Sequence, residues 1–102
     1  MIKHIVLNKA LPSVREEDLA LIFNDLASLK KRLSGMRSAS FGRSESPEGL
    51  ERGYTHGIVI EFDDMAALND YAQDAEHQAI GTRLIAATAG GIDGVLVVDL
   101  VV

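Results

Sequence analysis

The chain has 102 residues, of which 47% are hydrophobic and 25% are charged, and its formal net charge is −5. This composition is typical of a folded globular domain and excludes a disordered chain. The acidic balance argues against a nucleic-acid partner and against binding to an anionic membrane surface. The length fits one domain over residues 1–102 with a hydrophobic core of its own.

The sequence contains no cysteine, so it offers neither a disulfide framework nor a thiolate site. The N-terminal stretch MIKHIVLNKA lacks the long apolar segment and the small-residue cleavage site of a signal peptide. No apolar run approaches the length of a membrane span. We therefore expect a cytoplasmic protein with no membrane partner.

The first predicted elements are a strand over 2–9 and a long helix over 14–33. Ser13 and Glu16 have the spacing of a capping box, which predicts the start of this helix. Gly35 is expected to be its C′ residue. Apolar residues at spacings of three and four form one stripe along the helix: Leu19, Ile22, Phe23, Leu26, Leu29 and Leu33.

Weak alternation predicts a second strand over 36–43, followed by a polar loop over 44–53 that contains proline and glycine. A third strand is predicted over 52–62. Because side chains two residues apart share a face of a strand, Tyr54 and His56 are expected to point the same way.

Two shorter helices are predicted over 65–73 and 75–88, capped by the aspartate pair at 63–64 and by Asp74 respectively. A final strand is predicted over 94–102. The order is βαββαβ, which predicts the ferredoxin-like plait, an α+β fold in which helices cover one face of a four-stranded antiparallel sheet.

The predicted strands are apolar on both faces, although the helices can cover only one. The residues expected on the uncovered face are Val59, Leu96, Val98 and Leu100. A soluble monomer rarely exposes an apolar patch of this size. A second copy stacked sheet to sheet would bury it, so we expect a homodimer.

One possible catalytic group is a histidine–aspartate pair. His77 falls in the first turn of the last predicted helix, where unpaired backbone N–H groups favour the neutral imidazole that a general base needs. Asp99 interrupts the apolar final strand, and a carboxylate there needs a partner. We expect His77 to be that partner, with Tyr71 nearby at the end of the short helix.

Four other residues are possible parts of a pocket. His4 and His56 lie in the first and third strands, which are central neighbours in this fold, so their imidazoles are expected to be close. Each of them also has an ordinary structural interpretation as a hydrogen-bonded strand histidine. Tyr54 is expected to pack its ring at the strand entrance. Phe23 lies in the middle of the helical stripe, where it either fills the core or borders a ligand cavity.

The composition would allow a metal site of three histidines and an aspartate, but no local spacing of ligands predicts one, and no glycine-rich phosphate loop is present. We therefore predict neither a metal nor an organic cofactor.

The stretches KHIVL, PEGLERGYTHGIVIEF, DYAQDAEHQAI and VLVVDL together resemble the stress-responsive A/B barrel (Dabb) family over the whole chain. This resemblance implies a ferredoxin-like domain that dimerises through its sheet into an α+β barrel. One plant member of the family cyclises a linear polyketide. By similarity to it, His77 would be the general base, Tyr71 would hold the substrate carbonyl, Asp99 would orient His77, and His4 and His56 would line the pocket.

Three functional hypotheses follow. The first is a cyclase- or isomerase-like lyase that uses a histidine base on a small hydrophobic or polyketide-like ligand. The second is a non-enzymatic dimer that binds a hydrophobic metabolite or serves in stress protection. The third, from the wider group of dimeric α+β barrels, is a metal- or haem-assisted oxygenase, which is the weakest because no histidine is clearly placed as an axial ligand.

Overall fold

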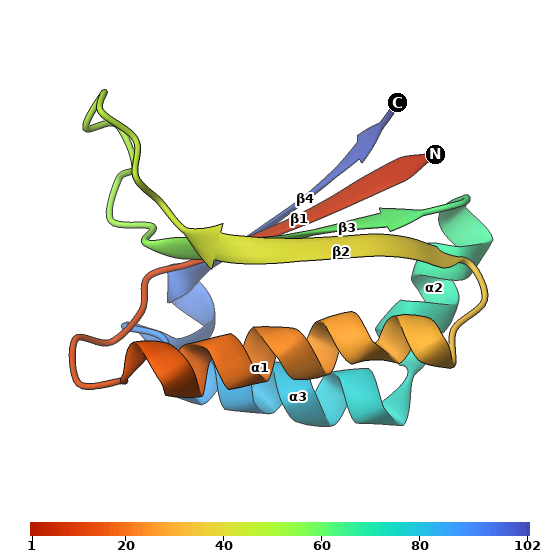
Figure 1. Cartoon of the computed structure of the whole chain (residues 1–102), viewed down its shortest axis with the longest axis horizontal. Helices are drawn as coiled ribbons and strands as arrows, with labels where there is room; N and C mark the ends of the chain where they lie inside the picture. Colours follow the sequence, from red (N-terminus) through yellow and green to blue (C-terminus); the bar gives the residue numbers. More distant parts are fainter.

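The strands form one antiparallel sheet, and the helices lie together on one side of it (Figure 1). The computed structural model describes residues 1–102. Two short 3-10 helices complete the chain, η1 and η2. The elements in chain order are β1 (Ile2–Asn8), α1 (Glu16–Ser28), η1 (Leu29–Lys31), β2 (Met36–Arg43), β3 (His56–Phe62), α2 (Met65–Gln73), α3 (Ala75–Ala86), η2 (Gly91–Gly94) and β4 (Val95–Val101).

The sheet order is β2-β3-β1-β4, with β1 and β3 in the centre, so the predicted ferredoxin-like topology is confirmed. Alternate residues of β1 and β3 are buried against the helices. The apolar stripe of α1 and η1 covers this face. Five members of the stripe are buried: Leu19, Ile22, Phe23, Leu26 and Leu29. Burial of this face supplies the main stabilising contribution, because the hydrophobic effect scales with the apolar area removed from water.

The predicted capping box of α1 is wrong. The helix begins at Glu16, and the residue at its N-cap position, Arg15, makes no side-chain capping hydrogen bond. The Glu16 carboxylate instead accepts a hydrogen bond from His56 in β3. The helix also ends earlier than the predicted residue 33, because its last turn tightens into η1.

Gly35 has a packing role rather than the predicted role of a left-handed C′ residue. Its φ is not positive. A Cβ atom at this position would lie 2.3 Å from the Cβ of Ala67, which is too close for any side chain. Glycine therefore lets the start of β2 approach α2.

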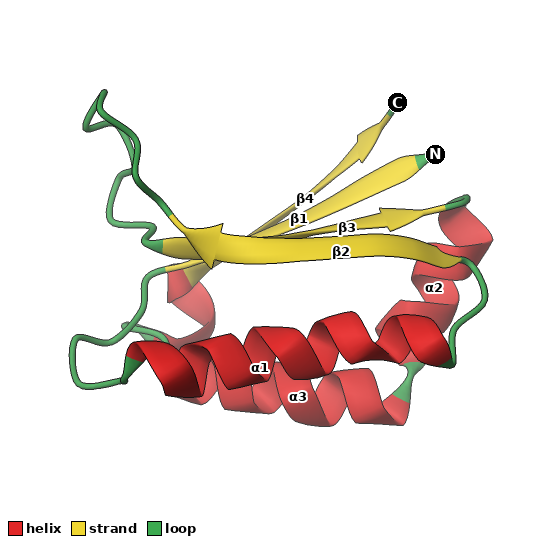
Figure 2. Cartoon of the chain, viewed as in Figure 1, coloured by secondary structure: helices red, strands yellow, loops and turns green.

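The third strand begins later than predicted, at His56. Tyr54 lies in the preceding loop, with the Lys9 ammonium 5.0 Å from its ring centre, so Tyr54 and His56 do not share a strand face. The loop that joins β2 to β3 rises beyond the sheet on the side away from the helices (Figure 2).

The two predicted aspartate caps are confirmed in part. Asp64 accepts a hydrogen bond from the Ala67 N–H at 2.9 Å, and Asp74 accepts one from the His77 N–H at 3.0 Å. Asp63 caps nothing and pairs with Arg37 instead. Arg32 donates two hydrogen bonds to Asp74 and holds the pKa of that carboxyl at about 2. This ion pair ties the end of η1 to the start of α3.

The face of the sheet away from the helices is apolar and uncovered. Leu96, Val98 and Leu100 of β4 point to this side and are 40%, 40% and 45% exposed. No helix of the protein has both the length and the apolar character that crossing a membrane requires.

Candidate functional site

A cavity of about 190 Å³ lies between the β1–β4 side of the sheet and the helices. Three polar side chains border it: His4 from β1, Tyr71 from the last turn of α2 and His77 from the first turn of α3. The rest of its lining is mainly apolar and comes from every layer of the fold: Val6, Leu26, Leu68, Leu84, Ile85, Ile92, Val95 and Val97.

Tyr71 lies at the centre of the polar group. Its side chain is 2% exposed, and its ring centre is 5.6 Å from that of His4 and 3.9 Å from that of His77. Burial raises the pKa of Tyr71 well above its usual range, so the phenol stays protonated. The hydroxyl makes no hydrogen bond to any protein group, although buried tyrosine hydroxyls usually have a partner. It is therefore a free hydrogen-bond donor beside the cavity.

His4 is held by Asp99, which is its direct cross-strand neighbour in the β1–β4 pair. Its Nδ1–H donates to Asp99 Oδ1 at 2.6 Å. An ionised carboxylate only accepts hydrogen bonds, so this contact fixes the proton of a neutral imidazole on Nδ1 and leaves Nε2 as an acceptor. The predicted hydrogen bond between Asp99 and His77 is wrong, because strand register brings His4 to the carboxylate.

His77 is half-buried, and its Nδ1 atom is fully buried with no hydrogen-bond partner. Burial lowers the pKa of His77, and the nearby His4 lowers it further, while the backbone around Tyr71 and Ala72 opposes the shift. The neutral imidazole is therefore favoured. The sequence predicts the same charge state from the helix N-terminus, but removal from water is the main cause.

The sequence pattern of the stress responsive A/B barrel domain matches residues 2–102. The chain belongs to this family. It is 28% identical over 98 residues to the stress-response A/B barrel domain-containing protein HS1 of Arabidopsis thaliana, which covers 96% of this chain and 86% of that protein.

Two further similarities connect this Dabb chain to an enzyme and to a dimer. It is 22% identical over 80 residues to olivetolic acid cyclase of Cannabis sativa, covering 78% of this chain and 79% of that protein. A dimeric ferredoxin-like protein of unknown function from Jannaschia sp. CCS1 matches its fold with a TM-score of 0.92 and 31% identity, covering 99% of this chain and 98% of the other.

Two of the residues predicted for the pocket of this Dabb domain lie elsewhere. His56 is four residues along the sheet from the level of His4, opposite Asn8, so the two imidazoles are not close. Phe23 is buried in the core, where its ring stacks on Phe41 at 5.6 Å between centres, and it does not line the cavity.

Sequence reasoning missed two polar partners of His56. The sequence pattern assigns Glu16 to a capping box, and it gives no signal for Thr55, because the neighbours of Thr55 depend on the path of the chain before β3. No group of three or more histidine, cysteine, aspartate or glutamate residues is arranged to hold a metal ion.

Proposed function

We propose that this Dabb domain carries out acid–base chemistry of the lyase or cyclase type on a small, uncharged carbonyl compound bound between the sheet and the helices. The observation that carries this proposal is the Tyr71 hydroxyl, which has no protein partner and lies in the same cavity as a neutral histidine. A carbonyl oxygen would give the hydroxyl the acceptor that the protein lacks. The similarity to olivetolic acid cyclase supports a reaction rather than binding alone.

Each polar residue then has a role. His77 accepts a proton from the carbon next to the carbonyl group, which its neutral ring is able to do near neutral pH. Tyr71 donates a hydrogen bond to the carbonyl oxygen and stabilises the negative charge that develops there. His4 packs edge-on against Tyr71 and, through its bond to Asp99, keeps that ring in position.

The cavity itself limits the substrate. Its volume of about 190 Å³ is below the range of roughly 300–1,000 Å³ that is usual for drug-sized ligands. No lysine or arginine lines it, so nothing in it would neutralise a carboxylate or a phosphate. Compact, uncharged ketones and aldehydes fit these limits better than a long polyketide chain.

Proton exchange at the α-carbons of cyclohexanone tests this chemistry. In D₂O, the wild-type protein should accelerate exchange of these hydrogens for deuterium, measured by the loss of their NMR signals. His77→Gln and Tyr71→Phe should each lower the protein-dependent rate about 100-fold, the lower end of general acid–base effects. Tyr54→Phe removes the other tyrosine hydroxyl, outside the cavity, and should have no effect. Equal rates in all four proteins would exclude the proposal.

The apolar lining also favours a second function, the binding of a hydrophobic metabolite without turnover. In that case cyclohexanone would bind to the cavity, but the protein would not accelerate the exchange.

We also infer that the protein forms a homodimer through the uncovered sheet face. The exposed apolar side chains of β4 and the dimeric state of the Jannaschia protein support this assembly. An interface of about 800 Å² per partner is the usual size. Val98→Lys places a charge in this face and should give a monomer or an aggregate. A wild-type protein that sediments as a monomer at micromolar concentration would contradict the dimer.

A further inference from the structure

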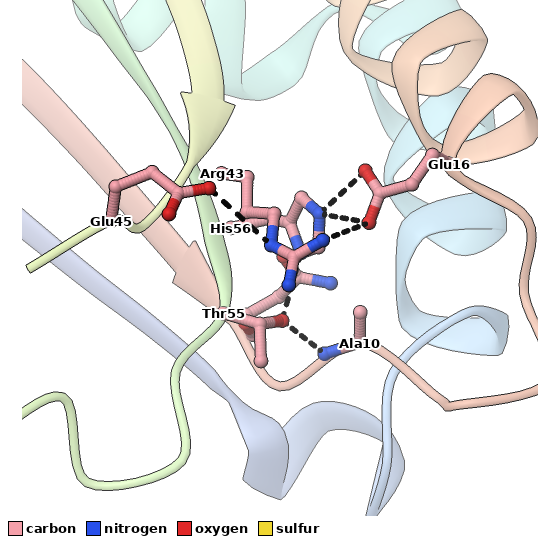
Figure 3. A network of polar contacts seen from close by, with 7 residues as sticks. Ala10, Glu16, Arg43, Glu45, Thr55 and His56 are labelled. Atoms are coloured by element: carbon pink, nitrogen blue, oxygen red, sulfur yellow. Dashed lines mark hydrogen bonds and ion pairs between the residues drawn. The ribbon is translucent and has the colours of Figure 1, made fainter.

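A second polar group lies at the other end of the β1–β3 pair, around His56 (Figure 3). The His56 side chain is buried, and both of its ring nitrogens have partners. Nε2 lies 3.0 Å from each oxygen of the Glu16 carboxylate, and Nδ1 lies 2.8 Å from Thr55 Oγ1. The three side chains therefore form a continuous chain of hydroxyl, imidazole and carboxylate.

The directions of these hydrogen bonds follow from the groups themselves. Glu16, when ionised, only accepts, so the Nε2–H of His56 is the donor. In neutral His56 the Nδ1 atom is then an acceptor, and Thr55 must donate its hydroxyl proton to it. The Thr55 oxygen accepts a hydrogen bond from the Ala10 N–H at 3.0 Å, which fixes the rotamer that points the hydroxyl at His56. The other possible acceptor of its proton, the Asn8 carbonyl oxygen, is farther away, at 3.4 Å.

This arrangement borders a cavity of its own. Thr55, His56 and Glu16 line a space of about 250 Å³ that shares no residue with the cavity around Tyr71. Its apolar wall comes from the segment before α1 and from the helix itself: Ala10, Leu11, Pro12, Val14 and Leu19. Thr55 is an exposed residue at the border of this cavity.

Arg43 adds a positive charge to the same cavity. Its guanidinium nitrogens lie 3.7 Å from Glu16 and 3.9 Å from Glu45, which are ion-pair distances without hydrogen bonds (Figure 3). The N–H groups of Arg43 therefore remain free to bind an oxygen that becomes negative during a reaction.

We propose that Thr55 is the nucleophile of a second catalytic site, which transfers the acyl group of short-chain carboxylic esters to water. A nucleophile hydrogen-bonded to a base that a third group orients is the arrangement that activates a hydroxyl for covalent catalysis. Glu16 holds the ring with its proton on Nε2, so that Nδ1 faces the hydroxyl. The apolar wall accommodates the acyl chain, and Arg43 stabilises the carbonyl oxygen.

The reaction has two steps. In the first, Thr55 Oγ1 forms a bond to the acyl carbon while its proton moves to His56 Nδ1. The bond between the acyl carbon and the ester oxygen then breaks, and the same proton passes to the departing alcohol. In the second step, water gives a proton to His56 and attacks the acyl-threonine. The carboxylic acid leaves, and the proton returns to Thr55.

The test uses p-nitrophenyl acetate with the full chain. Wild-type protein should release a stoichiometric burst of p-nitrophenol before slower turnover, and mass spectrometry should locate the acetyl group on the peptide that contains Thr55. Thr55→Val, which keeps the shape of the side chain, should abolish the burst and lower turnover about 100-fold. Thr55→Ser keeps the hydroxyl and should retain the burst.

Matched variants separate catalysis from folding. Glu16→Gln should lower the burst rate about 10-fold because it weakens the orientation of His56, whereas the exposed neighbour Glu17→Gln should leave it unchanged. If circular dichroism shows that Thr55→Val does not fold, the comparison of Glu16→Gln with Glu17→Gln tests the proposal instead. Acetyl groups found only on lysines, on a histidine or on the N-terminus would overturn the proposal. A wild-type burst rate in Glu16→Gln or in folded Thr55→Val would do the same.

Discussion

Two ends of the helix-covered sheet face, one around His4 and one around His56, hold similar residues in different surroundings. His4 and His56 are 8% and 9% exposed, and each is hydrogen-bonded to a carboxylate. At the His4 end, the Tyr71 hydroxyl and the buried Nδ1 atom of His77 have no hydrogen-bond partner, and both residues border an apolar cavity. At the His56 end, both ring nitrogens are paired, and the proposed nucleophile is the hydroxyl of Thr55. The extent of burial therefore does not define the chemistry of a histidine. The groups around its two ring nitrogens define it.

The largest expected effect concerns the core that separates the two ends. Phe23 is buried between them in α1 and stacks on Phe41. Phe23→Ala should lower the free energy of unfolding by about 3–5 kcal/mol, measured by denaturant titration, because it leaves a cavity in close-packed surroundings. Leu21→Ala, at an exposed position of the same helix, is the control and should change little. A loss of under about 1 kcal/mol for Phe23→Ala would mean that Phe23 borders a cavity already present in the protein.

A smaller effect distinguishes the partners of Asp99. In a double-mutant cycle, His4→Ala and Asp99→Asn should show a coupling energy of about 1 kcal/mol, as expected for a partly exposed charged hydrogen bond. His77→Ala combined with Asp99→Asn should give losses that simply add. Coupling of Asp99 to His77 instead of His4 would mean that Asp99 orients His77. The histidines of the two ends would then be more alike, because the base at the first end would also be held by a carboxylate.

The smallest effect is on the pH dependence of stability. Because the pKa of His77 in the folded protein lies below the ordinary 6.5, the unfolded chain binds this proton more readily. The stability from neutral His77 is fully present above pH 6.5 and is lost as the pH falls from 6.5 through the folded-state pKa. Thermal unfolding at several pH values should therefore show a steeper decline for wild type than for His77→Gln. Equal declines in stability for wild type and His77→Gln would mean that the His77 ring is exposed to water in the folded protein.

Local patterns predict the fold well because they act over short distances. The sequence predicts the second strand over 36–43, which are its bounds in the structure, and the caps Asp64 and Asp74 need only contacts three residues away. The errors involve distant partners. Asp99 pairs with a residue 95 positions earlier, and its choice between two histidines depends on the register of β4 against β1.

Glu16 shows the same limit. Its spacing from Ser13 satisfies the pattern of a capping box, but its partner His56 lies 40 positions away in β3. The pattern contains no information on that strand. The apolar character of both strand faces, in contrast, could be recognised from the sequence, because alternation within a single strand is enough to assign each side chain to a face.

The most direct test of the difference between the two ends is to map where a small ketone binds. Isotope-labelled wild-type protein titrated with cyclohexanone should show NMR shift changes at Tyr71, His77 and Val97, which border the first cavity. Signals of Thr55 and His56 should not move. Shift changes confined to the His56 end, or none around Tyr71 at saturating cyclohexanone, would contradict the assignment of carbonyl binding to the cavity around Tyr71 and His77.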